Sequence, residues 1–396
     1  MSKCRLCPRN CGADRVKCAE MPDVDKTISV FDNAYDLGGD GGKDICAGSD
    51  SVITEKRRYG FCGESSTIRI SRAALHMWEE PVVSGQRGSG AVFFTGCNLR
   101  CIFCQNAAIS EGGSGREVSP EELAAVFFSL EDQGAHNINL VTPTHFVPGI
   151  CEAIGIAKNR GMNLPFVYNT SGYESVETLR MLDGLIDVYL PDFKYMDEKK
   201  ARNYSNAPDY PEVAKEAIAE MYRQVGKPVT ESQKQNPGTI MGSETENKTR
   251  IENRKIEEAK HGVDAGVSVG SMANNENRDT GEEFNLIKRG MIVRHLVLPL
   301  GVKNACGVID YLAETYGESI YISIMNQYTP LFDVPDALRP EQRKRLEPYP
   351  ELHRKVTKRE YDRVIGHCLD LGLSNVFVQE DDASGANFIP TWNERI

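Results

Sequence analysis

The sequence predicts an α/β fold built on a parallel sheet, either open or closed into a barrel. From residue 91 onward, short apolar runs of strand length alternate with longer segments of helical character. This alternation is typical of repeated βαβ units. Gly172, Gly301 and Gly372 fall between these elements, where the chain has to turn.

The expected strands are short and mostly apolar. They lie at 92–95, 138–141, 166–169, 188–190, 291–298, 320–325 and 376–379, and a further short strand is expected at 67–71. The expected helices lie at 119–133, 149–160, 175–182, 212–224, 305–316 and 358–371. The first helix has the clearest start, since Ser119 is a good N-cap, Pro120 suits the first helical position and Glu122 completes a capping box.

Two segments interrupt the pattern. Residues 15–57 are rich in Asp and Gly, and a second segment, from about residue 227 to residue 285, is polar with few aromatic side chains. Such compositions bury too little apolar surface to offset the entropy of ordering. We therefore expect two flexible insertions, the second with a helix at 248–260. The predicted organisation is a Cys-rich N-terminal region at 1–88, a core at 89–380 interrupted by the second insertion, and a C-terminal tail at 381–396.

The charge and hydropathy of the chain argue against nucleic-acid binding and against a membrane span. The chain has 396 residues and a formal net charge of −11, which argues against nucleic acid as its main partner. No run approaches the roughly 20 apolar residues of a membrane span. The N-terminus has no apolar core of a signal peptide. We expect an intracellular, cytoplasmic protein that binds neither nucleic acid nor membrane.

The cysteines are concentrated near the N-terminus. Nine of the twelve lie within the first 104 residues. In a reducing compartment, dense cysteines are more often metal ligands than disulfide partners. The isolated Cys151, Cys306 and Cys368 are expected to be small apolar core residues.

One cysteine motif dominates the chain. Cys97, Cys101 and Cys104 follow an apolar strand with the spacing C-x3-C-x2-C. Three thiolates cannot close a four-coordinate site. A [4Fe–4S] cluster with one open iron fits this spacing. The alternative is a zinc site whose fourth ligand is His145 or a distant cysteine.

A second metal site is predicted in the N-terminal region. Cys4, Cys7, Cys11 and Cys62 supply four thiolates, enough for a closed zinc or iron–sulfur site. Nearby arginines at 5, 9 and 15 would offset its negative charge. The alternatives are a mobile segment of reduced thiols, or a site that uses Cys18 or Cys46 instead.

The cysteine motif and the α/β units after it resemble the radical S-adenosylmethionine (SAM) superfamily. The stretch 93–106 resembles the activating enzymes of glycyl-radical enzymes such as pyruvate formate-lyase, and the stretches 168–173, 189–197 and 294–299 resemble later segments of that family in order. The Cys-rich head with the stretch 72–81 resembles a less characterised branch of these proteins. The resemblance implies a partial (β/α)6-type, TIM-like barrel over residues 89–380.

The resemblance also implies a reaction. A [4Fe–4S] cluster on the three cysteines would bind SAM at its open iron and cleave it reductively to methionine and a 5′-deoxyadenosyl radical, which takes hydrogen from a substrate. A one-electron donor such as flavodoxin or ferredoxin would be needed, and the substrate would be a glycyl-radical enzyme. The alternatives are a radical SAM enzyme acting on a small molecule or peptide, and a non-catalytic iron–sulfur or zinc protein for electron transfer or regulation.

Polar residues at expected strand ends are the candidate SAM contacts, as barrel sites form at the carboxyl ends of strands. With the loop residues they are Phe103, Gln105, Asn106, Thr142, Asn169, Ser171, Asp192, Lys194 and Arg294. Phe103 is expected to lie against the adenine or to pack within its loop. Asp192 would accept from SAM hydroxyl or ammonium groups and Lys194 would meet the carboxylate.

The end of the second core strand departs from the family pattern. Relatives often carry a Gly-Gly-Glu-Pro stretch there, whereas this chain has Thr142-Pro-Thr-His145, with hydroxyls and no carboxylate. His145 is the best histidine candidate for the cavity, and His76, beside Trp78, is a candidate for simple packing.

Overall fold

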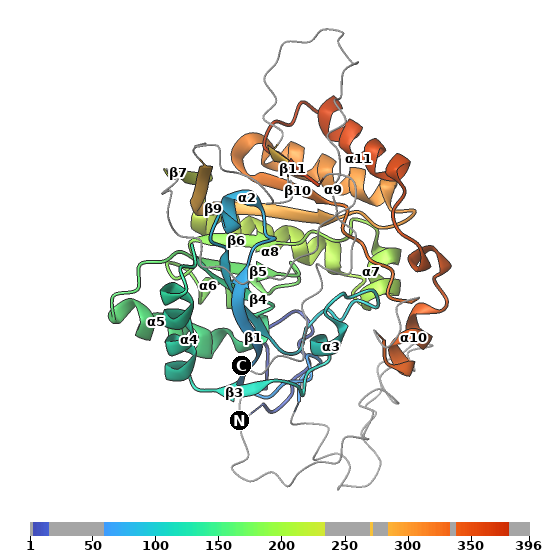
Figure 1. Ribbon diagram of the computed structural model, residues 1–396. Coiled ribbons are helices and arrows are strands. Elements are labelled where there is room, and N and C mark those ends of the chain that lie inside the picture. The colour runs from blue at the N-terminus through green and yellow to red at the C-terminus, as the bar shows by residue number, and fades with distance from the viewer. Residues whose placement is uncertain (1–2, 16–58, 234–269, 272–283, 333–337, 380–396) are drawn as a thin grey trace, which may run out of the picture.

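The computed structural model describes residues 3–15, 59–233, 270–271, 284–332 and 338–379 (Figure 1). Several predicted features lie outside these residues: most of both expected insertions, the expected helix at 248–260, Cys18, Cys46 and the C-terminal tail. In the described part, one twisted sheet forms the centre of the molecule and helices surround it (Figure 1).

The sheet has the strand order β3-β1-β2-β4-β5-β6-β9-β10-β11-β8, and β7 pairs separately with β9. Pairing is parallel from β2 through β4, β5, β6, β9, β10 and β11 to β8, while β1 lies antiparallel to both β2 and β3. The two edges, β3 and β8, do not pair with each other, so the sheet is a partial barrel as predicted. The strands are β1 Ile68–His76, β2 Ser89–Phe94, β3 Arg116–Val118, β4 Ile138–Val141, β5 Phe166–Thr170, β6 Val188–Pro191, β7 Val229–Gln233, β8 Gly270–Ser271, β9 Phe284–Leu296, β10 Tyr321–Met325 and β11 Val376–Val378.

Most of the helices connect successive parallel strands, as in βαβ units, whereas α2 lies between the antiparallel strands β1 and β2. The helices are α2 Pro81–Ser84, α3 Ala107–Ser110, α4 Pro120–Asp132, α5 Val147–Asn159, α6 Val176–Arg180, α7 Glu198–Ser205, α8 Tyr210–Val225, α9 Val302–Thr315, α10 Pro340–Leu346 and α11 Lys358–Asp370. The α4 start is the predicted capping box: the Ser119 hydroxyl accepts from the Glu122 amide, and the Glu122 carboxylate accepts from the Ser119 amide.

Every predicted core strand and helix is present; most ends differ by a few residues, but β9 begins at Phe284 and not at the expected 291. Three differences matter for the site. β1 extends to His76, well beyond the expected 67–71, and α7 and α10 were not expected. The polar segment predicted at 227–285 is ordered at both ends, because Val229–Gln233 pairs antiparallel with Phe284–Arg289.

The two faces of the sheet pack differently. On the outer face, Tyr168, Tyr189 and Val293 belong to the main core formed with the helices. On the inner face, Val167, Val188 and Ile292 pack in a smaller cluster against Val83 of α2. The inner face of the partial barrel is therefore closed at one level by α2, and the remaining inner side chains are free to form a site.

Candidate active site

The cysteine loop, residues 96–106, leaves the carboxyl end of β2. Gly96 has a φ of +78°, and a Cβ there would lie 2.6 Å from the backbone oxygen of Cys62, so only glycine fits. Arg100 holds a φ of +53°, which is unusual for a side chain of its size. Backbone strain of this kind is concentrated at functional sites and is maintained by the surrounding packing.

The loop directs donors to its sulfurs. The amides of Leu99 and Arg100 approach the Cys97 Sγ at 3.3 and 3.5 Å, and the Ser205 hydroxyl lies 3.1 Å from the Cys101 Sγ. Burial, together with the nearby thiols of Cys101 and Cys97, raises the pKa of Cys104 to about 12. The three thiols are thus within electrostatic reach of one another.

This donor set fits an iron–sulfur cluster. It consists of soft thiols, which such clusters require, and amide and hydroxyl donors that stabilise the bound sulfurs. As they stand, no three His, Cys, Asp or Glu side chains among the residues the structure describes are grouped closely enough to hold a single metal ion. His145 Nε2 lies 2.6 Å from the Thr95 carbonyl oxygen, while its Nδ1 has no hydrogen-bond partner. The alternative of a zinc ion closed by His145 stays a prediction.

A hollow of about 310 Å³, part of it open to solvent, lies beside the loop. Cys97, Cys104 and Asn106 line it from the cysteine loop, and Val141 and Thr142 line it from the end of β4. Thr142 has a φ of +59°, a genuine outlier for a β-branched residue. The structure places Asn106 and Thr142 in one hollow with Cys97 and Cys104, while their contact with SAM stays a prediction.

A charged network continues from the hollow across the ends of β5, β6 and β9. The Arg294 guanidinium donates to Asp192 at 3.1 Å, to Asn169 at 2.6 Å and to Glu79 at 3.0 Å. Lys194 Nζ lies 2.6 Å from the Asp192 carboxylate. The structure thus brings together four residues that the sequence placed at strand ends, and it adds Glu79.

The pKa shifts within the network keep both Asp192 and Lys194 charged. Burial alone would raise the pKa of Asp192, but the positive charges of Lys194 and Arg294 outweigh it and hold that pKa below its ordinary value. Burial would lower the pKa of Lys194, but Asp192 and the thiols of Cys101 and Cys104 raise it. Lys194 is therefore a permanent cation between the carboxylate and the cysteine loop.

Sequence reasoning missed Glu79 and Glu80. The long strand β1 and the short α2 place this pair on the inner face of the sheet. Glu79 accepts from Asn139 at 2.9 Å. Glu80 is 2% exposed, and its Oε2 has no hydrogen-bond partner, like the Oδ1 of Asn139. The available signal was a pair of carboxylates directly before Pro81, but nothing local shows that they turn inward.

Three other predicted contacts lie elsewhere around the loop. Phe103 is buried in the core, edge-on to Tyr204 and Tyr328 at 6.1 Å from each ring, which agrees with the packing alternative. Gln105 donates to the Gln327 carbonyl oxygen at 2.6 Å, so it joins the loop to the segment after β10. The hydroxyl of Ser171 is buried without a partner. SAM contacts by these residues stay predictions.

His145 is not a cavity residue, contrary to our expectation. It is buried, and burial together with the charge of Arg15 lowers its pKa to about 3. Its neutral ring supports the carbonyl oxygen of Thr95 at the base of the cysteine loop. His76 packs edge-on to Phe93, with 6.3 Å between the ring centroids.

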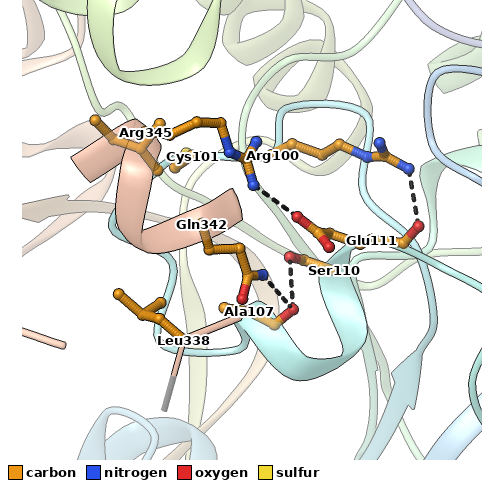
Figure 2. A pocket seen from close by; sticks show the side chains of 9 residues that line it. Arg100, Cys101, Ala107, Ser110, Glu111, Leu338, Gln342 and Arg345 are labelled. Carbon is orange, nitrogen blue, oxygen red and sulfur yellow. Dashed lines mark hydrogen bonds and ion pairs between the residues drawn. The ribbon is translucent and has the colours of Figure 1, made fainter. Parts of the chain in front are cut away.

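The C-terminal part of the chain supports the outer side of the cysteine loop. Figure 2 shows a small pocket in which Glu111 lies between Arg100 and Arg345. Arg100 donates to the Glu111 backbone oxygen at 2.9 Å, and Arg345 and Arg339 meet its carboxylate at 2.6 and 2.7 Å. Gln342 of α10 donates to the Ala107 carbonyl oxygen at 3.3 Å (Figure 2). Helix α10 thereby fixes α3, which follows the last cysteine.

Of the four predicted thiols of the N-terminal segment, the structure brings Cys11 and Cys62 together, because a Cβ on Gly60 would lie 3.4 and 3.2 Å from their sulfurs. The metal site on Cys4, Cys7, Cys11 and Cys62 stays a prediction. Among the helices that the structure describes, none is long and apolar enough to cross a membrane.

Residues 91–253 match the family model described as the Radical SAM superfamily. Over 172 residues the chain is 30% identical to an uncharacterized protein of Methanocaldococcus jannaschii, an alignment that covers 41% of this chain and 48% of the relative. The chain thus spans about half the length of that curated relative.

The comparison with solved structures gives weaker similarities. One is Streptococcus suis SuiB bound to precursor peptide SuiA, with a TM-score of 0.39 and 11% identity over 72% of this chain and 46% of SuiB. Another is methylornithine synthase (PylB), with a TM-score of 0.35 and 12% identity over 76% of this chain and 74% of that chain. The family match of residues 91–253 is thus to the radical SAM superfamily, whose members use a [4Fe–4S] cluster and SAM.

Proposed function

We propose that this chain, with its radical SAM domain, is an enzyme that holds a [4Fe–4S] cluster through Cys97, Cys101 and Cys104 and binds SAM at the open iron. The observation that carries the proposal is the continuity of the site. The hollow beside the three-thiol loop is lined by Cys97, Cys104 and Thr142. The Thr142 amide donates to the Asn169 carbonyl oxygen at 2.9 Å, and Asn169 belongs to the charged network at the strand ends.

The cluster, when reduced and bound to SAM, supplies an electron that releases methionine and a 5′-deoxyadenosyl radical. The protein's own part is to position these groups and to exclude water from them. Lys194 is a partly buried cation that would meet the SAM carboxylate. Thr142 and Asn106, which line the hollow, offer hydroxyl and amide groups to its polar atoms.

The Arg294 network has a positioning role in this proposal. Arg294 joins β9 to Asp192 of the β6 end and to Asn169 of β5. It therefore keeps the strand ends at a fixed separation around the SAM site. Such preorganisation lowers the cost of aligning reacting groups.

We further propose that the hydrogen donor is a glycine of a partner protein, so that the enzyme generates a glycyl radical. The order of the motifs at 93–106, 168–173, 189–197 and 294–299 supports this proposal. An electron donor such as flavodoxin or ferredoxin would reduce the cluster. Residues Phe103, Gln105 and Ser171 would support the SAM site from the cysteine loop and from the end of β5.

The test is SAM cleavage by anaerobically reconstituted, dithionite-reduced protein. We expect release of 5′-deoxyadenosine by the wild type and by Cys151→Ala, a cysteine on α5, and none by Cys101→Ala. A fully loaded and reducible wild-type cluster that releases none would refute the enzyme and would favour an electron-transfer or regulatory protein. Chromatography with mass detection of the nucleoside measures the result.

The partner is tested by isotope transfer. A candidate glycyl-radical protein labelled with deuterium at glycine should pass deuterium to 5′-deoxyadenosine. Release without label from any such protein, together with label from a small molecule or peptide, would reject the activating role and keep the radical SAM chemistry.

A further inference from the structure

We propose that the outer side of the cysteine loop is a docking surface for an acidic one-electron carrier protein. The surface is formed by residues 3–15, α7 and α10, which together we call the basic collar. This inference rests on the proposed function, because it names the side from which the cluster receives its electron. At this surface the reduced carrier loses one electron and the cluster gains it, while no proton moves and no bond breaks.

The cysteine loop has two sides, and its cysteines are divided between them. Cys97 and Cys104 line the hollow on the inner side, where we propose that SAM binds. Cys101 lines the pocket of Figure 2, which has a volume of about 240 Å³ and is partly open to solvent. Gln342 and Arg345 of α10 also line this outer pocket. A carrier protein on the outer side therefore approaches a cluster ligand without displacing SAM.

Helices α7 and α10 lie together on the outer side (Figure 1). Tyr349, just after α10, packs edge-on to Tyr204 of α7, with 5.2 Å between the ring centroids. The Tyr204 carbonyl oxygen accepts from the amide of Ile102 at 2.9 Å, and Ile102 also lines the outer pocket. Gln342 of α10 donates to the Ala107 carbonyl oxygen. Both helices are thus fixed to the cysteine loop and form a preformed surface.

The N-terminal segment 3–15 borders the same region. The Arg9 guanidinium donates to the carbonyl oxygen of Asn98 in the cysteine loop at 2.8 Å. It also donates to the carbonyl oxygen of Ser205, the last residue of α7, at 2.8 Å. Segment 3–15 therefore contacts both the loop and α7, and it continues the surface that the two helices begin.

The collar is positive, although the whole chain has a net charge of −11. Residues 3–15 contain four Lys or Arg and one Asp, and residues 339–360 contain eight Lys or Arg, four Glu and no Asp. Helix α7 adds three basic residues and one Glu. Arg5, Arg202 and Lys344 are exposed members of the three parts. A positive surface on a negative protein attracts an acidic partner to this position, while the rest of the protein repels it.

The acidic residue of the outer pocket does not cancel this charge. The Glu111 carboxylate is bound by Arg345 at 2.6 Å and by Arg339 at 2.7 Å, and Arg100 donates to its backbone oxygen at 2.9 Å. Three guanidinium groups therefore surround one carboxylate beside Cys101.

An electron carrier fits this position better than a hydrogen donor does. A hydrogen donor has to reach the 5′-deoxyadenosyl radical, which would form on the inner side, where SAM is proposed to bind. An electron carrier only has to approach the cluster, and the outer pocket offers that approach at Cys101. The collar is therefore assigned to the carrier.

The first test is the affinity of the full-length protein for an acidic flavodoxin and for an acidic plant-type ferredoxin, both oxidised, measured by isothermal titration calorimetry at low salt. Arg202→Glu/Lys344→Glu should bind at least about tenfold more weakly than the wild type, because two attractive charges become repulsive. The matched control, Arg160→Glu/Lys227→Glu, reverses two exposed charges outside the collar and should bind as the wild type does. Added salt should weaken wild-type binding. No binding of either carrier by the wild type, or equal affinities in all three proteins, overturns the docking surface.

The second test follows cluster reduction by absorbance without SAM, so it does not depend on SAM cleavage. At low concentration, the reduced carrier should reduce the cluster of Arg202→Glu/Lys344→Glu at least about tenfold more slowly than that of the wild type. Photoreduced 5-deazaflavin, which is too small to need a docking surface, should reduce both clusters at equal rates. Equal slowing with both reductants overturns the docking role. Slowing with the carrier alone, in a protein that never cleaves SAM, keeps the docking surface and refutes the proposed function.

Discussion

Arg294→Met is the substitution that most sharply tests the buried charge network. The guanidinium meets the carboxylates of Asp192 and Glu79, and the three side chains are only 9–15% exposed. Removal of one partner from a buried ion pair costs about 3–5 kcal/mol of unfolding free energy, since the other charge is left uncompensated. Lys194 still pairs with Asp192 at 2.6 Å. The stranded charge is therefore mainly Glu79, and we expect a loss near the lower end, about 3 kcal/mol.

The double variant Arg294→Met/Glu79→Gln separates lost attraction from stranded charge. Neutralising Glu79 should recover roughly 1–2 kcal/mol, because contacting charges are strongly coupled. The control is Lys288→Met on the same strand, whose ion pair with Glu231 is exposed, with side chains 36% and 58% accessible. An exposed pair contributes about 1 kcal/mol or less.

Urea denaturation of the equally reconstituted proteins, followed by circular dichroism, measures these differences. The reasoning is refuted if Arg294→Met costs no more than Lys288→Met. It is also refuted if Glu79→Gln destabilises the Arg294→Met protein further.

Three other predictions follow from single positions. Burial raises the pKa of Glu174 from 4.5 to about 7, so its stabilising contribution is complete below pH 4.5 and is lost as the pH rises through 7. Measured by urea unfolding relative to Glu174→Gln, the wild type should therefore lose about 3 kcal/mol of unfolding free energy between pH 4.5 and 8. A difference between the two proteins that does not change with pH would contradict this. Gly96→Ala should lower the iron content sharply, because the new Cβ meets backbone. Gly113 has a similar φ of +77° and no atom within 4 Å of its added Cβ, so Gly113→Ala should lose only about 1 kcal/mol of unfolding free energy and keep its iron. Lys194→Met should raise the KM for SAM at least about tenfold, as expected for the loss of a hydrogen bond from a charged donor. Lys199→Met, on the exposed start of α7, should leave the KM unchanged. Equal KM values for the two variants would show that Lys194 does not belong to the SAM site.

The sequence was sufficient for the order of the elements. The core strands are short apolar runs between turn residues, and their helices have recognisable starts such as Ser119, so local pattern and tertiary structure agree there. The edges were harder. β7, Val229–Gln233, is polar and exposed, and it is a strand only because Phe284–Arg289 pairs with it. Local propensity is weak evidence for a strand of this kind.

The candidate site was predictable in part for a related reason. Cys97, Thr142, Asp192 and Arg294 follow or end apolar strands, and parallel strands bring such residues to one edge of the sheet. Glu79 and Glu80 precede a four-residue helix, and their inward position depends on where β1 ends. His145 was expected in the cavity, because the sequence does not show that its Nε2 forms a hydrogen bond with the Thr95 carbonyl oxygen. These contacts join residues far apart in sequence.

The central claim is that the cluster held by Cys97, Cys101 and Cys104 keeps one iron open for SAM. The most direct measurement is the electron paramagnetic resonance spectrum of the reduced cluster in the wild-type protein, with and without SAM. We predict a [4Fe–4S] spectrum that shifts when SAM is added. A reduced cluster whose spectrum is identical with and without saturating SAM would contradict the claim.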